Sequence, residues 1–207
     1  MAKKTTSAKG AADVAGQWQL AGYLLWILMA GAWAMVTLSL VSYDPADPPS
    51  IAVAPLNAEP TNWIGWVGAF VAHKAYLMIG PGVWVLITAG AALLIALIRK
   101  RPPSQLVIRG IGAGLMAVVV SALIGITAPE LFQRAEGSGG LIAYYINHEL
   151  TARFNTPGTM VILVIAFWIG ALLAVDELVL ALPRYIGRAA GMVPRVSMPS
   201  TELVSAL

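Results

Sequence analysis

The sequence predicts an all-α, polytopic membrane protein with four transmembrane helices and short interfacial helices in its two outer loops. Only 11% of the 207 residues are charged and 58% are hydrophobic, whereas about a quarter of a typical soluble domain is charged. Four stretches are apolar over nearly, or more than, the roughly 20 residues that cross the hydrocarbon core as a helix. An alternating strand pattern is missing, and backbone groups in lipid must be satisfied internally, so helices are expected.

The apolar stretches divide the chain into a membrane domain and two tails. We expect a cytoplasmic N-terminal tail over residues 1–19, a four-helix transmembrane domain over 20–182, and a cytoplasmic tail or linker over 183–207. The first stretch, with lysines before it and Ala32-Trp33-Ala34 inside it, has a cleaved signal peptide as its alternative. Because the apolar run continues past Met35, we expect a retained helix. The stretches are 20–42, 75–98, 110–128 and 158–175, the last extendable to Leu182.

Two Asp-Pro pairs follow the first stretch and predict where its helix stops. A proline lacks the backbone N–H and moves the preceding residue out of the helical region, so Asp44-Pro45 and Asp47-Pro48 cannot continue a helix. Their carboxylates also need water. The alternative is that Asp44 and Asp47 chelate a cation, but Ca²⁺ takes six to eight oxygens and this short loop supplies few. We therefore expect a mechanical role as a helix-stop turn.

Both outer loops contain aromatic stretches that we interpret as interfacial helices. Residues 62–73 are rich in Trp and residues 139–148 contain adjacent tyrosines, and both residue types favour the membrane–water interface. The two stretches also resemble each other in spacing. Gly65 precedes His73 by eight residues, as Gly140 precedes His148, and a Pro-Gly pair follows each histidine. Coincidence is the alternative to a parallel internal repeat, which predicts that the two hairpins superpose.

Glycines and prolines inside the apolar stretches mark expected packing or break points. Gly80-Pro81-Gly82 interrupts the second stretch. It either breaks a helix in mid-membrane or, as we favour, places a proline near the outer end of a tilted helix with glycines allowing close packing. Gly110 and Gly114 form a small-xxx-small pair at which another helix can approach.

Basic residues indicate the orientation. Ten of the 13 Lys and Arg lie in the two tails and the central link, so the positive-inside rule predicts that both termini are cytoplasmic. Five of these residues are expected to face anionic lipid headgroups, since they are too few for a nucleic-acid site: Arg99, Lys100, Arg101, Arg184 and Arg188.

The sequence contains no pattern typical of catalysis. There is no Cys and no phosphate-binding G-x-x-x-x-G-K-[ST] motif, and the second His of a zinc-protease motif beginning at His148 would stand where Ala152 does. A metal shared by the two histidines is the alternative to ordinary interfacial histidines. We expect no enzyme activity, no catalytic residue, no metal and no cofactor, while bound lipid is compatible with the exposed apolar helices.

A set of loop motifs resembles a known family. The first span ends in S-Y-D-P-A-D-P-P-S, followed by N-W-I-G-W-V-G-A-F-V-A with Gly65 and Gly68, then I-G-P-G, then G-S-G-G-L-I-A-Y-Y-I. Over residues 20–182 the chain resembles the four-helix membrane domain of the FtsK/SpoIIIE DNA translocases. The resemblance implies a bacterial inner-membrane anchor at the division septum that assembles with copies of itself and with other division proteins. The linker, motor and DNA-reading end of that family are not in this sequence.

The resemblance predicts a non-enzymatic membrane anchor and assembly domain of a cell-division and chromosome-partition translocase, without direct nucleic-acid binding by this chain. Its expected partners are membrane lipids and other integral-membrane proteins, as a homo-oligomer or within a hetero-complex. The alternative is an accessory structural subunit of a larger integral-membrane complex, such as an energy-converting one. A small transporter is a more distant alternative, because spans one to three offer no polar path.

Overall fold

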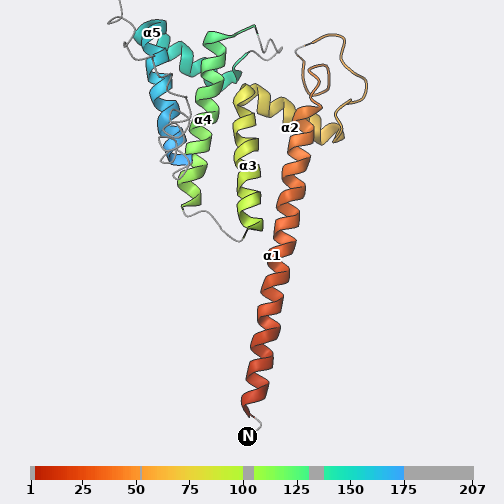
Figure 1. The fold of residues 1–207 in the computed structure, drawn as a ribbon. Coiled ribbons are helices and arrows are strands. Elements are labelled where there is room, and N and C mark those ends of the chain that lie inside the picture. The colour runs from red at the N-terminus through yellow and green to blue at the C-terminus, as the bar shows by residue number, and fades with distance from the viewer. Residues whose placement is uncertain (1–2, 52, 100–104, 131–137, 175–207) are drawn as a thin grey trace, which may run out of the picture. The chain divides into compact units, whose positions relative to one another are not determined.

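The computed structural model describes residues 3–51, 53–99, 105–130 and 138–174, and within the first helix the side chains of Leu20 and of the residues from Gly22 onward. All of these belong to one compact unit that ends at Ala174. The described residues form helices and turns without a strand, which confirms the predicted fold class (Figure 1). The elements are α1 (Lys3–Val41), α2 (Gly65–Met78), the 3₁₀ turn η1 (Gly80–Gly82), α3 (Val83–Ile98), α4 (Leu106–Thr127) and α5 (Gly140–Ala174).

Four helical segments are long and apolar enough to cross a membrane, as predicted, although they start at different residues from those expected. The second begins at Gly80 rather than at residue 75, because the chain turns there, and the third begins at Leu106. The fourth lies within α5, which is 35 residues long. Helix α1 has 39 residues and is therefore about 58 Å long. It begins at Lys3, so the helix includes most of the residues that the sequence assigned to the N-terminal tail.

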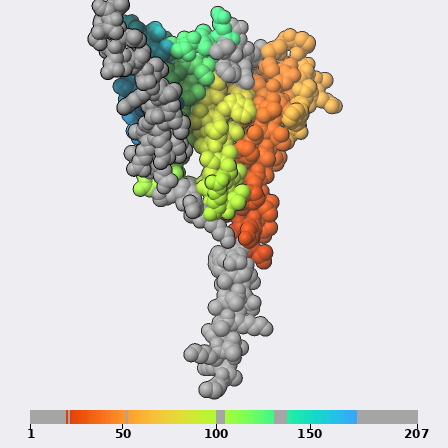
Figure 2. Space-filling model, viewed as in Figure 1, coloured from red at the N-terminus to blue at the C-terminus, as the bar shows by residue number. Residues whose placement is uncertain are grey.

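The described chain forms two hairpins that are joined side by side. The first consists of α1, α2, η1 and α3, and the second of α4 and α5. Figure 2 shows α1 and α3 next to one another, and α3 also contacts α4. Each hairpin rises along one span, crosses along a helix and descends along the next span (Figure 1). The end at which the hairpins cross is called the outer end below, because the sequence predicts that it faces outward. In the second hairpin the corner lies inside α5, at the non-helical Asn155 beside Pro157.

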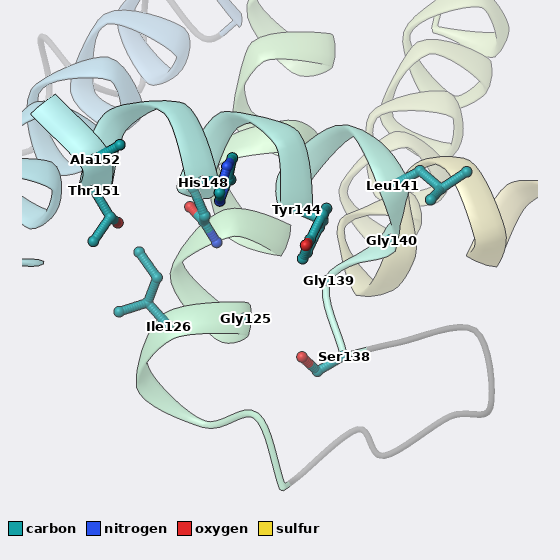
Figure 3. A pocket seen from close by; sticks show the side chains of 11 residues that line it. Gly125, Ile126, Ser138, Gly139, Gly140, Leu141, Tyr144, His148, Thr151 and Ala152 are labelled. Atoms are coloured by element: carbon teal, nitrogen blue, oxygen red, sulfur yellow. The ribbon is translucent and has the colours of Figure 1, made fainter.

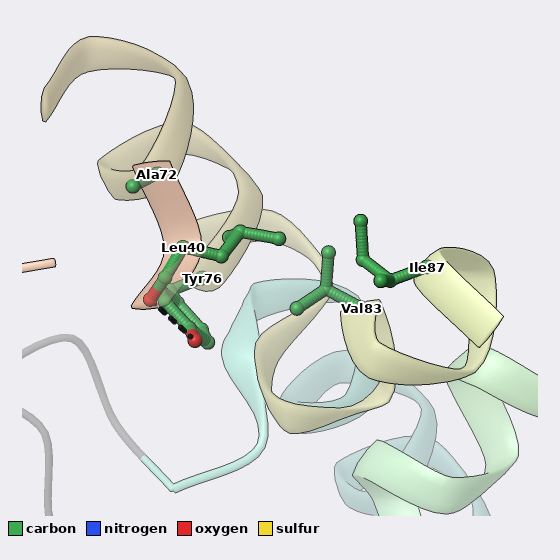
Figure 4. Packing of buried hydrophobic residues seen from close by; sticks show 5 residues of the cluster. All are labelled: Leu40, Ala72, Tyr76, Val83 and Ile87. Carbon is green, nitrogen blue, oxygen red and sulfur yellow. Dashed lines mark hydrogen bonds between the residues drawn. The ribbon is translucent and has the colours of Figure 1, made fainter. Parts of the chain in front are cut away.

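Two sets of contacts hold the first hairpin together: a buried cluster around Tyr76 at its outer end, and hydrogen bonds from two tryptophans along the spans. Tyr76 packs with Leu40, Ala72, Val83 and Ile87, and its hydroxyl donates to the Leu40 carbonyl (Figure 4). Along the spans, the indole N–H groups of two α1 tryptophans donate to α3 carbonyls. Trp26 reaches the Leu94 oxygen at 3.3 Å and Trp33 reaches the Ile87 oxygen at 3.0 Å. Donors and acceptors are each seven residues apart, which fits two antiparallel helices.

The second hairpin is held by close backbone approach. Val119, Ala122, Ala143 and Leu163 form its buried cluster. Near the start of α4 and the end of α5, a Cβ atom at Gly112 would lie 2.5 Å from the Ala174 nitrogen and 2.8 Å from the Gly170 oxygen, and one at Gly170 would lie 3.1 Å from the Gly112 oxygen. The two glycines therefore let α4 and α5 approach each other.

The predicted packing pair Gly110 and Gly114 makes no close contact within the described chain. A Cβ at either residue would meet nothing within 4 Å. Gly112, which lies between them, carries the contact with α5. Residues two apart on a helix point in very different directions, so Gly112 faces α5 while Gly110 and Gly114 do not.

Ser121 of α4 joins the two hairpins. Its hydroxyl is fully buried, donates to the Ile79 carbonyl and accepts a 2.7 Å hydrogen bond from the Gly82 N–H. Both partners are backbone groups that the turn between α2 and α3 leaves without a helical partner. Gly82 itself packs against the Ala117 backbone of α4. The Gly80-Pro81-Gly82 stretch is thus a corner at the outer end of the second span that also docks the first hairpin on the second.

Candidate functional site

The outer loop of the first hairpin is built around one buried carboxylate. Helix α1 ends at Val41, just before the two Asp-Pro pairs. The structure distinguishes the two acids: Asp47 is 2% exposed, whereas Asp44 remains half-buried and accepts from the Ala46 N–H at 2.8 Å. Asp47 Oδ1 accepts from Asn57 Nδ2 at 2.8 Å and from the Thr61 N–H at 2.9 Å, and Oδ2 accepts from the Asn62 N–H at 3.0 Å. One residue thereby fixes a loop that returns 15 positions later.

The hydrogen bonds decide the charge state of Asp47. Burial raises the pKa of this carboxyl, but the hydrogen bonds from Thr61, Asn57 and Asn62 together outweigh it, so the pKa lies below its ordinary value of 3.8. N–H and O–H donors stabilise the ionised form. Asp47 is therefore an anion at neutral pH, held by neutral donors instead of by a basic side chain.

The hydrogen bonds to Asp47 argue against the alternative that Asp44 and Asp47 bind a cation. The oxygens of Asp47 already accept from N–H groups, and the Thr61 hydroxyl lies 3.2 Å from Oδ1 and 3.3 Å from Oδ2. A cation would have to displace donors that point at the same lone pairs. Among the described residues there is also no group of three or more His, Cys, Asp or Glu side chains able to hold a metal ion. The hydrogen-bonded turn accounts for both acids.

Asn62 connects this loop to the ends of two helices. Its Nδ2 donates to the Ser39 carbonyl at 2.8 Å and to the Ser42 carbonyl at 3.2 Å, at the end of α1. Its Oδ1 accepts from the Ile64 N–H at 3.1 Å, just before α2. Gly68 of α2 packs directly on this amide and on Ser39, so a side chain at Gly68 would displace Asn62. Gly65 has φ +66°, a conformation that favours glycine.

Helix α2 has a buried face and an exposed aromatic face. Gly68, Ala69, Ala72, His73 and Tyr76 are buried. On the opposite side, Trp63 just before the helix is 68% exposed and Trp66 is 58% exposed. Trp66 stacks on Phe70 with ring centroids 5.7 Å apart, and Lys74 Nζ lies 5.9 Å from the Phe70 ring centroid. An aromatic face with one cation next to it is the composition expected at a membrane–water interface.

The corresponding corner of the second hairpin contains a cavity of about 710 Å³. It lies between the outer end of α4 and the first half of α5 (Figure 3). Tyr144 and His148 stack in one wall with ring centroids 6.2 Å apart. Asn147 donates to the Ala122 carbonyl at 2.9 Å, and its own buried Oδ1 has no hydrogen-bond partner. Ile126, Leu141 and Thr151 also line the cavity.

Of the five residues expected to face lipid headgroups, one lies within the described part of the chain. Arg99 follows α3 as its C-terminal cap and is exposed. Lys100, Arg101, Arg184 and Arg188 lie outside the described residues, as does the predicted tail over 183–207.

Several residues that hold the corners were missed from the sequence. Asn57, Thr61 and Asn62 are polar loop residues of a common type, and only the fold shows that they converge on Asp47. Ser121 was missed because a single serine in an apolar span is usual. A usable signal existed for Trp26 and Trp33, since their seven-residue spacing places both on one face of a helix.

Comparison with known proteins identifies this four-helix arrangement. The model of a family described as the 4TM region of the DNA translocases FtsK/SpoIIIE matches residues 19–186. The chain belongs to this family. The predicted resemblance is thereby confirmed, and with it a multi-pass membrane domain of a cell-division and chromosome-partition translocase family.

Two curated relatives of this family come from Neisseria meningitidis. Both are named DNA translocase FtsK 1, one from serogroup A and one from serogroup B, and each is 33% identical to this chain over 75 residues. The match covers 36% of this chain and 9% of each relative, so it concerns a small part of those proteins. No solved structure matches the chain.

Proposed function

We propose that this chain anchors a cell-division and chromosome-partition translocase in the bacterial inner membrane and serves as its assembly domain, without chemistry of its own. The observation that carries the proposal is the combination of family membership with a fold whose spans keep exposed apolar faces. Such a domain fixes position in the bilayer and offers surfaces to neighbours.

The distribution of charge supports an orientation with both termini in the cytoplasm. Basic residues gather in the two tails and the central link, and the positive-inside rule places these segments inside. The Asp47 loop, α2 and the first half of α5 are then on the outer side. Because the chain has no Cys, single cysteines can test this directly. Ile51→Cys, at a position 90% exposed in the outer loop, should react with a membrane-impermeant maleimide in intact spheroplasts, whereas Lys4→Cys should react only after lysis.

Localisation tests the anchoring role. A fluorescent fusion to this chain, expressed at low level in dividing cells, should be enriched at the division site. The matched control is the same fusion carrying Gly82→Val, which disrupts the joint between the hairpins. Even distribution of the parent fusion over the envelope would contradict the proposal, and co-purification of a stoichiometric complex unrelated to division would favour the accessory-subunit alternative.

A further inference from the structure

Helix α2 has a stripe of large apolar side chains on the face that does not pack on the protein. Trp66, Phe70 and Lys74 follow one another at intervals of four residues and so lie on one helical face, and Val67 lies beside them. Trp66 and Val67 are 58% and 59% exposed, and Phe70 is 39% exposed. Trp66, Val67 and Phe70 are called the α2 stripe below. Lys74 places its charge beside the Phe70 ring, as long basic side chains do where hydrocarbon meets headgroups.

The stripe begins at the level where a membrane span ends. The N–H of Trp63, which stands just before α2, donates to Ser42 Oγ at 3.1 Å. Ser42 follows Val41, which is the last residue of α1 and of the span Gly22–Val41. Val41 is 55% exposed and Trp63 is 68% exposed. In Figure 1 the start of α2 lies past α1, on the side away from α3. A lipid monolayer around the span would therefore meet the stripe at the depth of its headgroups.

The crossing part of α5 also presents aromatic side chains, but it is more polar than α2. Tyr144 and Tyr145 are each 64% exposed, with ring centroids 5.8 Å apart. Exposed tyrosines are typical of the headgroup level of a membrane. Further along, Glu149 and Arg153 form a largely exposed ion pair of 2.9 Å, as expected of a surface in contact with water. This crossing thus reaches the headgroups with its rings and inserts less deeply than α2.

Both crossings lie at the same end of the molecule (Figure 1). The first has 14 residues, and the second runs from Gly140 to the corner at Asn155. Each is about 20 Å long and about 10 Å wide. At the opposite end α3 stops at Ile98, α4 starts at Leu106, and α1 continues past its span as one helix. Among the described residues, no helix crosses between spans at that end.

We propose that the α2 stripe and the two tyrosines insert into one leaflet, and that this makes the domain a wedge that favours membrane convex on the side of the crossings. The inserted side chains add area to that leaflet, and the described residues offer no counterpart in the other. A convex leaflet spreads its headgroups apart, and binding of amphipathic helices depends on such curvature. The wedge goes beyond the proposed anchoring role and does not depend on it, since it follows from the shape of the domain alone.

Membrane tethers pulled from giant vesicles test the wedge. The full chain carrying Ile51→Cys, at a position 90% exposed in a chain without Cys, is reconstituted in phosphatidylcholine and phosphatidylglycerol. An impermeant maleimide dye added outside marks the copies whose crossings face outward. The outer leaflet of a tether is strongly convex, so these copies should be several-fold enriched on the tether relative to a lipid dye. Copies with inward crossings, labelled by a permeant dye after the outward copies are blocked, should be depleted.

A variant of the stripe tests which surface is responsible. Trp66→Ser combined with Phe70→Ser should lower the enrichment of the outward copies to less than half, because it removes two inserted rings. Unchanged hydrogen exchange at the Thr61 amide would show that the corner remains folded. The matched control is Ile165→Ser combined with Trp168→Ser, at positions 54% and 48% exposed within the last span. This control should leave the enrichment as it is.

Three results overturn the wedge. The first is a lack of enrichment of the outward copies on the tether. The second is equal enrichment of both orientations, which a shape with one broad end cannot produce. The third is unchanged enrichment in the stripe variant, which would assign the curvature preference to another part of the chain. Each of these leaves the anchoring role intact, because localisation of the fluorescent fusion tests that role separately.

Discussion

The two hairpins share a plan, but they fill their outer corners differently. In the first, Tyr76 packs on Leu40 and on Tyr43, whose ring centroid is 5.0 Å from that of Tyr76, beneath α2. In the second, Thr151 stands eleven residues after Gly140, as Tyr76 does after Gly65, and it lines a cavity of about 710 Å³. The position that Tyr76 fills with an aromatic ring in the first hairpin is occupied in the second by the smaller Thr151 next to a cavity. The first corner is thus tightly packed, and the second is the one with room to change.

The joint between the hairpins should be the most sensitive point of this comparison. Gly82→Val places a branched side chain against the Ala117 backbone and the Ser121 hydroxyl, and overpacking of this kind costs about 1–3 kcal/mol. We expect a loss at the upper end of this range, measured as a lower melting temperature in detergent by tryptophan fluorescence. Gly114→Val on α4 is the matched control, because a Cβ there meets nothing within 4 Å. Equal loss in both variants would show that helix propensity, and not the joint, is responsible.

The Asp47 network should set the rigidity of the first corner. Asp47→Asn removes the negative charge that accepts hydrogen bonds from three residues. Hydrogen bonds to a charged group each contribute about 1.5–3 kcal/mol to stability. The asparagine amide keeps part of this contribution, because its oxygen can still accept. We expect faster hydrogen exchange at the Thr61 and Asn62 amides, with unchanged exchange in the second hairpin. Asp44→Asn is the control, since Asp44 is less buried and its contacts with Asn57 and Thr61 are longer, at 3.5 Å and 3.4 Å.

Acid should loosen the first corner before the second. Because the pKa of Asp47 is lowered in the folded state, its contribution to stability is complete above the unfolded value of about 3.9 and is lost as the pH falls through the folded pKa. Exchange at the Thr61 and Asn62 amides should therefore be steady from pH 7 to about pH 4 and accelerate below it, after correction for intrinsic rates. In Asp47→Asn this acceleration should disappear. An increase centred near pH 6 would contradict the assignment to this carboxyl.

Filling the cavity should make the second corner resemble the first. We expect this change to have the smallest effect on stability among the variants described. Thr151→Tyr places at this position the ring that Tyr76 supplies in the first hairpin. We expect a gain of about 1 kcal/mol from added apolar burial, seen as a higher melting temperature. Ile142→Tyr, at a position of the same helix that is 37% exposed and does not line the cavity, is the control for a change in surface aromatic content. Destabilisation by Thr151→Tyr alone would show that the cavity shape does not accept a ring.

Sequence reasoning reached the helices more securely than the contacts between them. Charge-free runs and Asp-Pro pairs fixed four spans and the end of α1, because burial in lipid and loss of the backbone N–H are local requirements. The choice between Asp44 and Asp47 depends on Asn57, Thr61 and Asn62, which are distant along the chain. The same limit explains why Gly110 and Gly114 were chosen when Gly112 makes the contact: the packing face of α4 is defined by α5.

The two indole hydrogen bonds between α1 and α3 have a mechanical consequence. Trp26 and Trp33 are bonded to Leu94 and Ile87 at the same seven-residue interval, so sliding α1 along its axis by one residue, about 1.5 Å, would misplace both donors at once. Helix α1 therefore has a single preferred axial register relative to α3. A pull applied to the N-terminal end of α1 would be passed to the corner at its other end as displacement of the whole hairpin, not as slippage of one helix within it.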